Sequence, residues 1–220
     1  ELGVKEKDIL QIPPFFILHK PSDDVDEELK QKLTQTFSVL FVGRIVPNKG
    51  VIHLLRTLDR YLHDFDQDIH LHIVGGLNMA DPTFYLELTE LIKEKRLSSY
   101  VTFHNKVNET KRNTFYRYSS VFLVMSEHEG FCVPVIEAQH HGLPVISGGE
   151  CALADTAGNE QIIIKSTDYS LFAAALYTLK KNKNMRQYLQ SQGYKNRDKY
   201  KKQNYTDSLV QSLSLYQVEG

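Results

Sequence analysis

The chain has 220 residues, a formal net charge of −1 and a mean hydropathy of −0.35. A balanced charge gives no indication of a nucleic-acid partner, and no apolar run in the sequence approaches the length of a membrane span. Its two cysteines, Cys132 and Cys151, are too few for a disulfide framework, which favours a reduced, cytoplasmic protein. Because the first residue is not Met, we expect the chain to be a fragment of a longer protein.

The first 35 residues predict a connecting segment followed by a surface helix. Residues 9–18 are apolar but contain Pro13 and Pro14, so they could form an edge strand that the prolines terminate. This strand would have no earlier strand to pair with. Residues 24–33 are acidic and then helical in pattern. We therefore interpret residues 1–35 as an interdomain link and a surface helix.

From residue 36 onward, apolar strands alternate with amphipathic helices. Strands are predicted over residues 37–43, 69–74, 100–104, 121–125, 144–147 and 161–164, and helices over 50–62, 85–92, 110–118, 134–141, 170–181 and 184–200. This alternation predicts a doubly wound, Rossmann-like α/β fold, in which helices cover both faces of a parallel sheet. We assign residues 36–203 to this domain. Residues 204–220 are expected to form a last helix that packs toward a domain outside the chain.

Residues 126–138 join a predicted buried strand to a predicted helix and carry two glutamates. Glu129 lies in the loop, and Glu137 lies in the first turns of the helix. The backbone N–H groups at the start of a helix attract anions and hydroxyl oxygens; here they belong to Gly130, Phe131, Cys132 and Val133. Two carboxylates beside such donors can bind a polyol. The alternative is that each glutamate only complements the helix dipole.

A second loop, residues 43–50, is expected to face the first. In the common doubly wound order, strand 37–43 lies beside strand 121–125, and ligands bind between their carboxyl ends. This loop carries Arg44 and Lys49, and Asn48 is a candidate N-cap for the following helix. A guanidinium, an ammonium and free amides together can bind a diphosphate. The alternative is that both cations are solvated loop charges.

Other candidate residues give weaker indications. His70 and His72 alternate on a strand and His140 and His141 are adjacent, but a metal site would need a further convergent ligand, so surface or packing roles are favoured. Cys132 lies near a helix N-terminus, which can lower the pKa of a thiol. A nucleophile also needs a partner base, and the sequence places none there.

Several motifs occur together, in an order typical of one enzyme family: Gly43-Arg44, Lys49-Gly50, Glu129-Gly130-Phe131, Glu137-Ala138 and Gly142-Leu143-Pro144-Val145-Ile146. The chain thereby resembles the carboxy-terminal domain of a family 4 (group 1) glycosyltransferase. That family consists of retaining enzymes with the two-domain GT-B fold, and the glutamates eight positions apart match its paired-glutamate motif. The resemblance extends from Leu10 to Asp168 and so covers nearly the whole chain.

The resemblance implies a role for each motif. Arg44 and Lys49, with Gly43 beside them, would contact the donor diphosphate. Glu129 and the amides of residues 131–133 would contact the donor sugar, and Glu137 would accept from the ribose hydroxyls. The loop near the base would be Asn105, Lys106 and Val107.

The implied activity is transfer of a sugar from a UDP-, GDP- or ADP-sugar with retention of configuration, by a hexosyltransferase type of enzyme that needs no metal. The alternative is a non-catalytic module that senses a nucleotide sugar or serves a partner. The family's amino-terminal acceptor domain has no counterpart in these residues. We expect it to lie elsewhere in the native protein, where it could also contact a membrane surface.

Four residues depart from the family pattern. Cys132 and Asn105 stand where glycine is common, and Ala154 and Asp155 stand where Pro and Glu are common. A side chain at position 132 leaves the backbone less free, whereas Asn tolerates left-handed geometry. These departures bear on donor preference more than on the assignment of the fold.

Overall fold

The computed structural model describes Leu18, residues 23–76, 82–149 and 152–200, and Val210. Its centre is a six-stranded sheet in the order β3-β2-β1-β4-β5-β6, in which all pairings are parallel. The strands are β1 (Phe37–Val42), β2 (Ile69–Val74), β3 (Val101–His104), β4 (Val121–Val124), β5 (Val145–Gly148) and β6 (Ile162–Ile164). The chain moves outward from β1 to β3 and then resumes at β4 on the other side of β1. This confirms the doubly wound, Rossmann-like fold.

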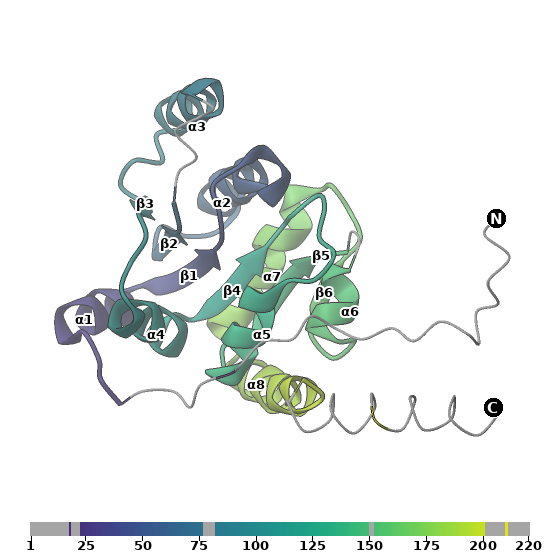
Figure 1. The fold of residues 1–220 in the computed structure, drawn as a ribbon. Helices are drawn as coiled ribbons and strands as arrows, with labels where there is room; N and C mark the ends of the chain where they lie inside the picture. Colours follow the sequence, from purple (N-terminus) through teal and green to yellow (C-terminus); the bar gives the residue numbers. More distant parts are fainter. Residues whose placement is uncertain (1–17, 19–22, 77–81, 150–151, 201–209, 211–220) are drawn as a thin grey trace, which may run out of the picture.

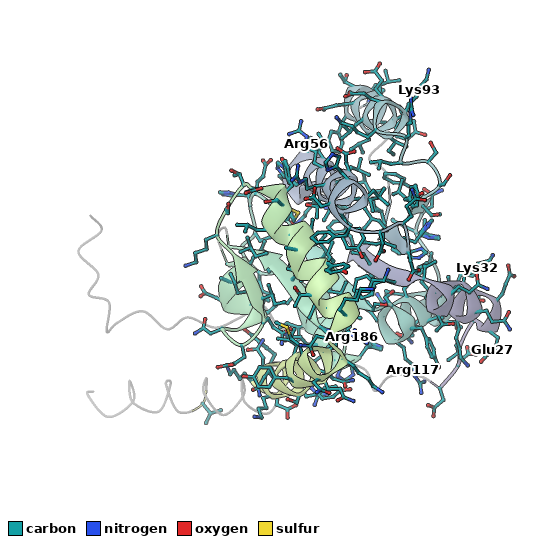
Figure 2. All side chains as sticks on the ribbon, turned by 180° about the vertical axis from the view of Figure 1, so that it is seen from behind. Glu27, Lys32, Arg56, Lys93, Arg117 and Arg186 are labelled. Atoms are coloured by element: carbon teal, nitrogen blue, oxygen red, sulfur yellow. The ribbon has the colours of Figure 1, made fainter. Side chains whose placement is uncertain are left out.

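Helices lie on both faces of the sheet (Figure 1). They are α1 (Glu27–Gln35), α2 (Val51–Asp64), α3 (Pro82–Glu94), α4 (Glu109–Tyr118), α5 (Val133–His140), α6 (Leu153–Ala157), α7 (Tyr169–Lys181) and α8 (Lys183–Asp198), with a short 3₁₀ turn, η2, at Pro47–Lys49. Helices α2 and α7 pack together on one face, whereas α4 and α5 lie on the other face, with α1 on α4 and α8 on α5. Figure 2, seen from behind, brings α2 and α7 to the front.

The core consists of the strands and the inward faces of the helices. In strand β1 the consecutive residues Val39, Leu40 and Phe41 are all buried. Both faces of the strand are therefore covered by helices, as is usual in parallel sheets. Helix α2 buries Leu54, Leu55 and further apolar residues at helical spacing, as its pattern predicts. Burial thus orients α2 so that its N-terminus faces the end of β4.

The cap of α2 is Gly50 and not Asn48, so that prediction is wrong. Gly50 has a φ of 70°, and a Cβ at this position would collide with the backbone carbonyl of Met125. Only glycine permits this close approach between α2 and the end of β4. Asn48 lies instead in the 3₁₀ turn, where its carbonyl oxygen accepts a hydrogen bond from the backbone N–H of Glu127.

Two further elements differ from the sequence prediction. Helix α6 was not predicted, because five residues are too few to show a helical period. Helix α8, expected on the surface, buries Leu189 and Asn196, and the Asn196 amide donates to the Gln139 side chain at 2.9 Å. The predicted edge strand at residues 9–18 (apart from Leu18) and the predicted last helix (apart from Val210) lie outside the described residues.

Candidate functional site

The loops that follow β1 and β4 meet at the carboxyl edge of the sheet. The N–H of Glu127 donates to the carbonyl oxygen of Asn48 at 3.0 Å, which joins the two loops through their backbones. Beside this contact, Lys49 Nζ lies 2.6 Å from Glu129 Oε1. These side chains are only 17% and 9% exposed, so the ion pair is well shielded from water. The fold therefore brings together two of the predicted site residues from loops far apart in sequence.

Arg44 lies at the same edge but is differently placed. Its side chain is exposed and forms no ion pair within the described ranges of the chain. The backbone around it is tightly packed, since Gly43 donates to Val74 at 3.0 Å and Gly75 donates to His104 at 2.9 Å. A Cβ on Gly75, whose φ is 153°, would collide with the Gly43 carbonyl. This packing places the loops after β1, β2 and β3 side by side.

The loop of residues 105–107 extends this edge beyond β3. Asn105 and Lys106 are exposed, and the Lys106 stem would be in van der Waals contact with a Cβ at Gly76. Val107 is partly buried against the core. Asn108 then caps α4, accepting from the backbone N–H of Lys111. The structure thus places this loop at the carboxyl edge of the sheet, and its assignment to the base stays a prediction.

Helix α5 begins beside the Lys49–Glu129 pair. It starts at Val133 with Pro134 in its first turn, and its N-cap residue Cys132 makes no side-chain cap. Within the described part of the chain, the N–H groups of Gly130, Cys132 and Val133 have no acceptor. Gly130 is exposed, with open space around it. These amides are therefore available to an anion or a hydroxyl oxygen at this edge of the sheet.

Cys132 is not an activated thiol. Burial, together with the nearby Glu129 carboxylate, raises its pKa to about 12. The effect of the helix N-terminus that the sequence suggested is therefore outweighed by desolvation, which disfavours a thiolate in apolar surroundings. Cys132 acts as a small packing residue at the start of α5.

Glu137 is held from α4 by two residues that the sequence analysis missed. The Tyr116 hydroxyl donates to Glu137 Oε2 at 2.8 Å, and Arg112 Nη1 lies 3.9 Å from Oε1. Tyr116 is fully buried, and burial and the Glu137 charge raise its pKa well above the ordinary value, so it remains a donor. Positions 112 and 116 are four residues apart and so lie on one face of a helix. This spacing is the sequence signal that could have suggested that the two side chains share a partner.

His141 completes this arrangement on the far side of Tyr116. Its ring stacks on the Tyr116 ring at a centroid distance of 5.3 Å, and its Nδ1 lies 2.9 Å from the carbonyl oxygen of Glu137. The Glu137 side chain is 23% exposed. It is therefore oriented by buried neighbours while part of it still faces solvent.

The predicted histidine pair packs with a third histidine. His72 Nδ1 lies 3.2 Å from His104 Nε2, and the His70 ring lies beside His72 at a centroid distance of 4.7 Å, with the two rings tilted. Burial lowers the pKa of His72 to about 3 and that of His104 to about 4, so both are neutral at pH 7. Among the residues that the structure describes, no three His, Cys, Asp or Glu side chains converge as a metal site would require.

In the same described ranges, no helix combines the length and apolar character needed to cross a membrane.

Comparison with known proteins decides the family. Residues 15–196 match the family model described as "Glycosyl transferases group 1". This chain belongs to the group 1 glycosyltransferases. The family resemblance inferred from the motifs is thereby confirmed at this level.

Individual group 1 glycosyltransferases and related structures agree with this. The capsular polysaccharide biosynthesis glycosyltransferase CapM of Staphylococcus aureus is 26% identical over 182 residues, which cover 79% of this chain and 44% of CapM. The crystal structure of Anabaena HepE with UDP and glucose superposes with a TM-score of 0.73 at 17% identity, covering 85% of this chain and 51% of HepE. The chain therefore spans about half or less of these proteins.

A third match is to an isolated domain. The C-terminal domain of the group 1 family protein LpcC from Francisella tularensis superposes with a TM-score of 0.67 at 19% identity. The match covers 80% of this chain and 92% of that domain. The fold described above is thus that of a domain already known from this family.

Proposed function

We propose that the carboxyl edge of the sheet at Lys49, Glu129 and the start of α5 forms a crevice that binds a nucleoside diphosphate sugar, and that the chain is the donor-binding half of a retaining hexosyltransferase. The observation that carries this proposal is the Lys49–Glu129 pair beside the free amides of α5 and the N-terminus of α2. A cation, a carboxylate and unpartnered N–H groups within one crevice are complementary to a molecule that joins a diphosphate to a polyol.

Lys49 and Arg44 are assigned to the diphosphate. An ammonium has three N–H donors, so Lys49 can keep Glu129 as a partner and still donate to a phosphate oxygen. During transfer the bond between the anomeric carbon and the diphosphate oxygen breaks, an acceptor oxygen replaces it, and negative charge grows on the leaving diphosphate. Cations and a helix N-terminus that are already in place stabilise that charge. No metal ion is required by this assignment.

The two glutamates are assigned to different parts of the donor. Glu129 has one carboxylate oxygen beside Lys49, and it lies next to the exposed Gly130, where a sugar ring has room. Glu137 is oriented by Tyr116 one turn into α5 and is assigned to the ribose hydroxyls. HepE, which shares this fold, was solved with UDP and glucose, and this supports a nucleotide sugar as the ligand class.

The acceptor is assigned to a part of the native protein outside this chain. Positioning of a second substrate can account for roughly 7–11 kcal/mol of a barrier, and it requires a surface that closes over the crevice. We therefore expect the full-length protein to form product from a labelled donor and the isolated chain to form none. A full-length protein that binds donor but transfers nothing would favour a sensing module instead.

The assignment of the glutamates is tested by calorimetry with UDP and UDP-glucose. Glu137→Gln should weaken the binding of both ligands, because both contain ribose, whereas Glu129→Gln should weaken the binding of UDP-glucose only. Each lost charged hydrogen bond should cost about 1.5–3 kcal/mol. An equal effect of Glu129→Gln on the two ligands would show that Glu129 does not contact the sugar.

A further inference from the structure

The sugar loop, residues 129–132, precedes α5 and carries Glu129, which is assigned to the donor sugar. The N–H group of Ala152, before α6, donates to the carbonyl oxygen of Glu129 at 3.3 Å and so holds the start of the loop. Gly130, the next residue, is exposed and has open space around it. Because glycine leaves the backbone unusually free, the geometry of the loop beyond this point depends on the side chains that follow.

Phe131 packs against the residues that end α8. Its ring meets the ring of Tyr200 edge to face, with the centroids 5.4 Å apart and the ring planes inclined by 64°. Both side chains are partly buried against the core. Edge-to-face aromatic pairs are favourable beyond the apolar area that they bury. The contact therefore holds Phe131 between Gly130 and Cys132, whose N–H groups have no acceptor within the described part of the chain.

Tyr200 has a fixed place because α8 is aligned along α5. The two helices lie side by side (Figure 1). Gly193 of α8 lies against the Gln139 side chain, and Asn196, further along α8, donates to the Gln139 amide oxygen at 2.9 Å. Tyr200 follows Asn196 and meets Phe131, which precedes α5. The two helices therefore run antiparallel, and the end of α8 lies at the start of α5.

A buried amide network sets the register of α8 on α5. Gln139 and Asn196 are both buried. The Gln139 amide donates to the carbonyl oxygen of Ala157 at 2.7 Å, and the Asn196 amide donates to that of Thr156 at 2.8 Å. Sliding α8 along α5 would leave these amides buried without partners, which is costly. The network therefore keeps the end of α8 at the sugar loop.

The surroundings of Tyr200 also favour a packing role. Burial raises the pKa of its hydroxyl, and the Asp155 carboxylate on α6 raises that pKa further. The phenol is therefore neutral at pH 7 and adds no charge beside the loop. Tyr200 thus lies where α6, α8 and the sugar loop meet.

We propose that Tyr200 is a positioning residue for the donor sugar. It packs on Phe131 and thereby keeps the adjacent N–H groups in the geometry that binds the sugar. The ribose contact does not depend on it, because Glu137 is oriented separately by Tyr116 from α4. This role rests on the proposed function, and it adds the end of α8 to the elements that recognise the sugar.

The test is calorimetry of the chain with UDP-glucose and with UDP, together with thermal unfolding of each variant. Tyr200→Leu should weaken binding of UDP-glucose roughly two- to tenfold, the range expected for loss of an aromatic pair, and leave the affinity for UDP unchanged. Tyr200→Phe keeps the ring and should keep most of the affinity for UDP-glucose. Tyr188→Leu is the matched control, because Tyr188 is exposed on the same helix and its hydroxyl donates to Glu160.

A double-mutant cycle tests whether Tyr200 acts through Phe131. Phe131→Leu alone should weaken binding of UDP-glucose, and adding Tyr200→Leu should cause little further loss. Additive losses would overturn the proposal, and so would an unchanged affinity for UDP-glucose in Tyr200→Leu. An equal loss for UDP and UDP-glucose, or a matching loss in Tyr188→Leu, would also overturn it, because the substitution would then act through the fold as a whole. If the unmodified chain binds neither ligand, the proposed function fails and this role fails with it.

Discussion

Replacement of Tyr116 by Phe removes one hydroxyl and leaves the buried ring in place. That hydroxyl donates to Glu137 Oε2 at 2.8 Å and so fixes the carboxylate before a ligand arrives. A Glu side chain that must be ordered on binding loses roughly 1.5–2 kcal/mol of rotamer freedom. We therefore expect Tyr116→Phe to weaken UDP binding by about 1–2 kcal/mol, or roughly five- to thirty-fold.

The assay is calorimetry with UDP and with its 2′,3′-dideoxy analogue, which has no ribose hydroxyls for Glu137 to accept from. Only the affinity for UDP should fall. Tyr118→Phe is the matched control, because it removes a hydroxyl from the same helix and no contact joins that hydroxyl to Glu137. An equal loss for both ligands would mean that Tyr116 acts through the fold, and no loss would refute its role in orienting Glu137.

Three further outcomes are expected. Lys49→Ala and Arg44→Ala should each weaken binding of a nucleoside diphosphate by about 1.5–3 kcal/mol, and the loss should be larger for Lys49→Ala because it leaves the Glu129 carboxylate unpaired beside the phosphates. Calorimetry should show that adding Glu129→Gln to Lys49→Ala recovers part of the lost affinity, and no recovery would contradict this coupling. UDP affinity should be unchanged by EDTA, and loss of most affinity on chelation would show that the site depends on a metal. Acid should destabilise the fold between about pH 6.5 and pH 4, because unfolded histidine binds protons there while His72 and His104, with pKa values of about 3 and 4, stay neutral in the folded state. His72→Leu should lower the slope of unfolding free energy against pH by up to about 1.4 kcal/mol per unit, measured by urea unfolding at pH 5 and pH 7, and an unchanged slope would contradict the assignment.

The sequence predicted what depends on periodicity and topology. Alternating strands and helices imply the doubly wound order, and that order places Lys49 beside Glu129, because the carboxyl ends of adjacent parallel strands lie at one edge. What it missed depends on contacts between elements. Gly50 caps α2 because the chain of β4 passes too close for a side chain, and nothing local in the sequence reveals that approach.

Tyr116 shows the same limit within the site. On α4 it is one aromatic residue among others, and only the packing of α4 against α5 gives its hydroxyl a carboxylate partner. Cys132 shows that a rule based on local sequence can also predict a pKa shift in the wrong direction. Its position at a helix start suggests a lowered pKa, and the burial that raises its pKa becomes visible only in the assembled core.

The ion pair between Lys49 and Glu129 sets in advance the distance at which a ligand must present an anion and hydroxyl groups. With the 2.6 Å contact formed, both side chains are already ordered, and a phosphate alone or a sugar alone meets only half of the arrangement. A donor bound as proposed brings its diphosphate to the remaining N–H groups of the ammonium and its hydroxyls to the second oxygen of the carboxylate at once, so neither side chain has to be ordered on binding. The affinity for the intact donor should therefore exceed the affinity for either fragment alone.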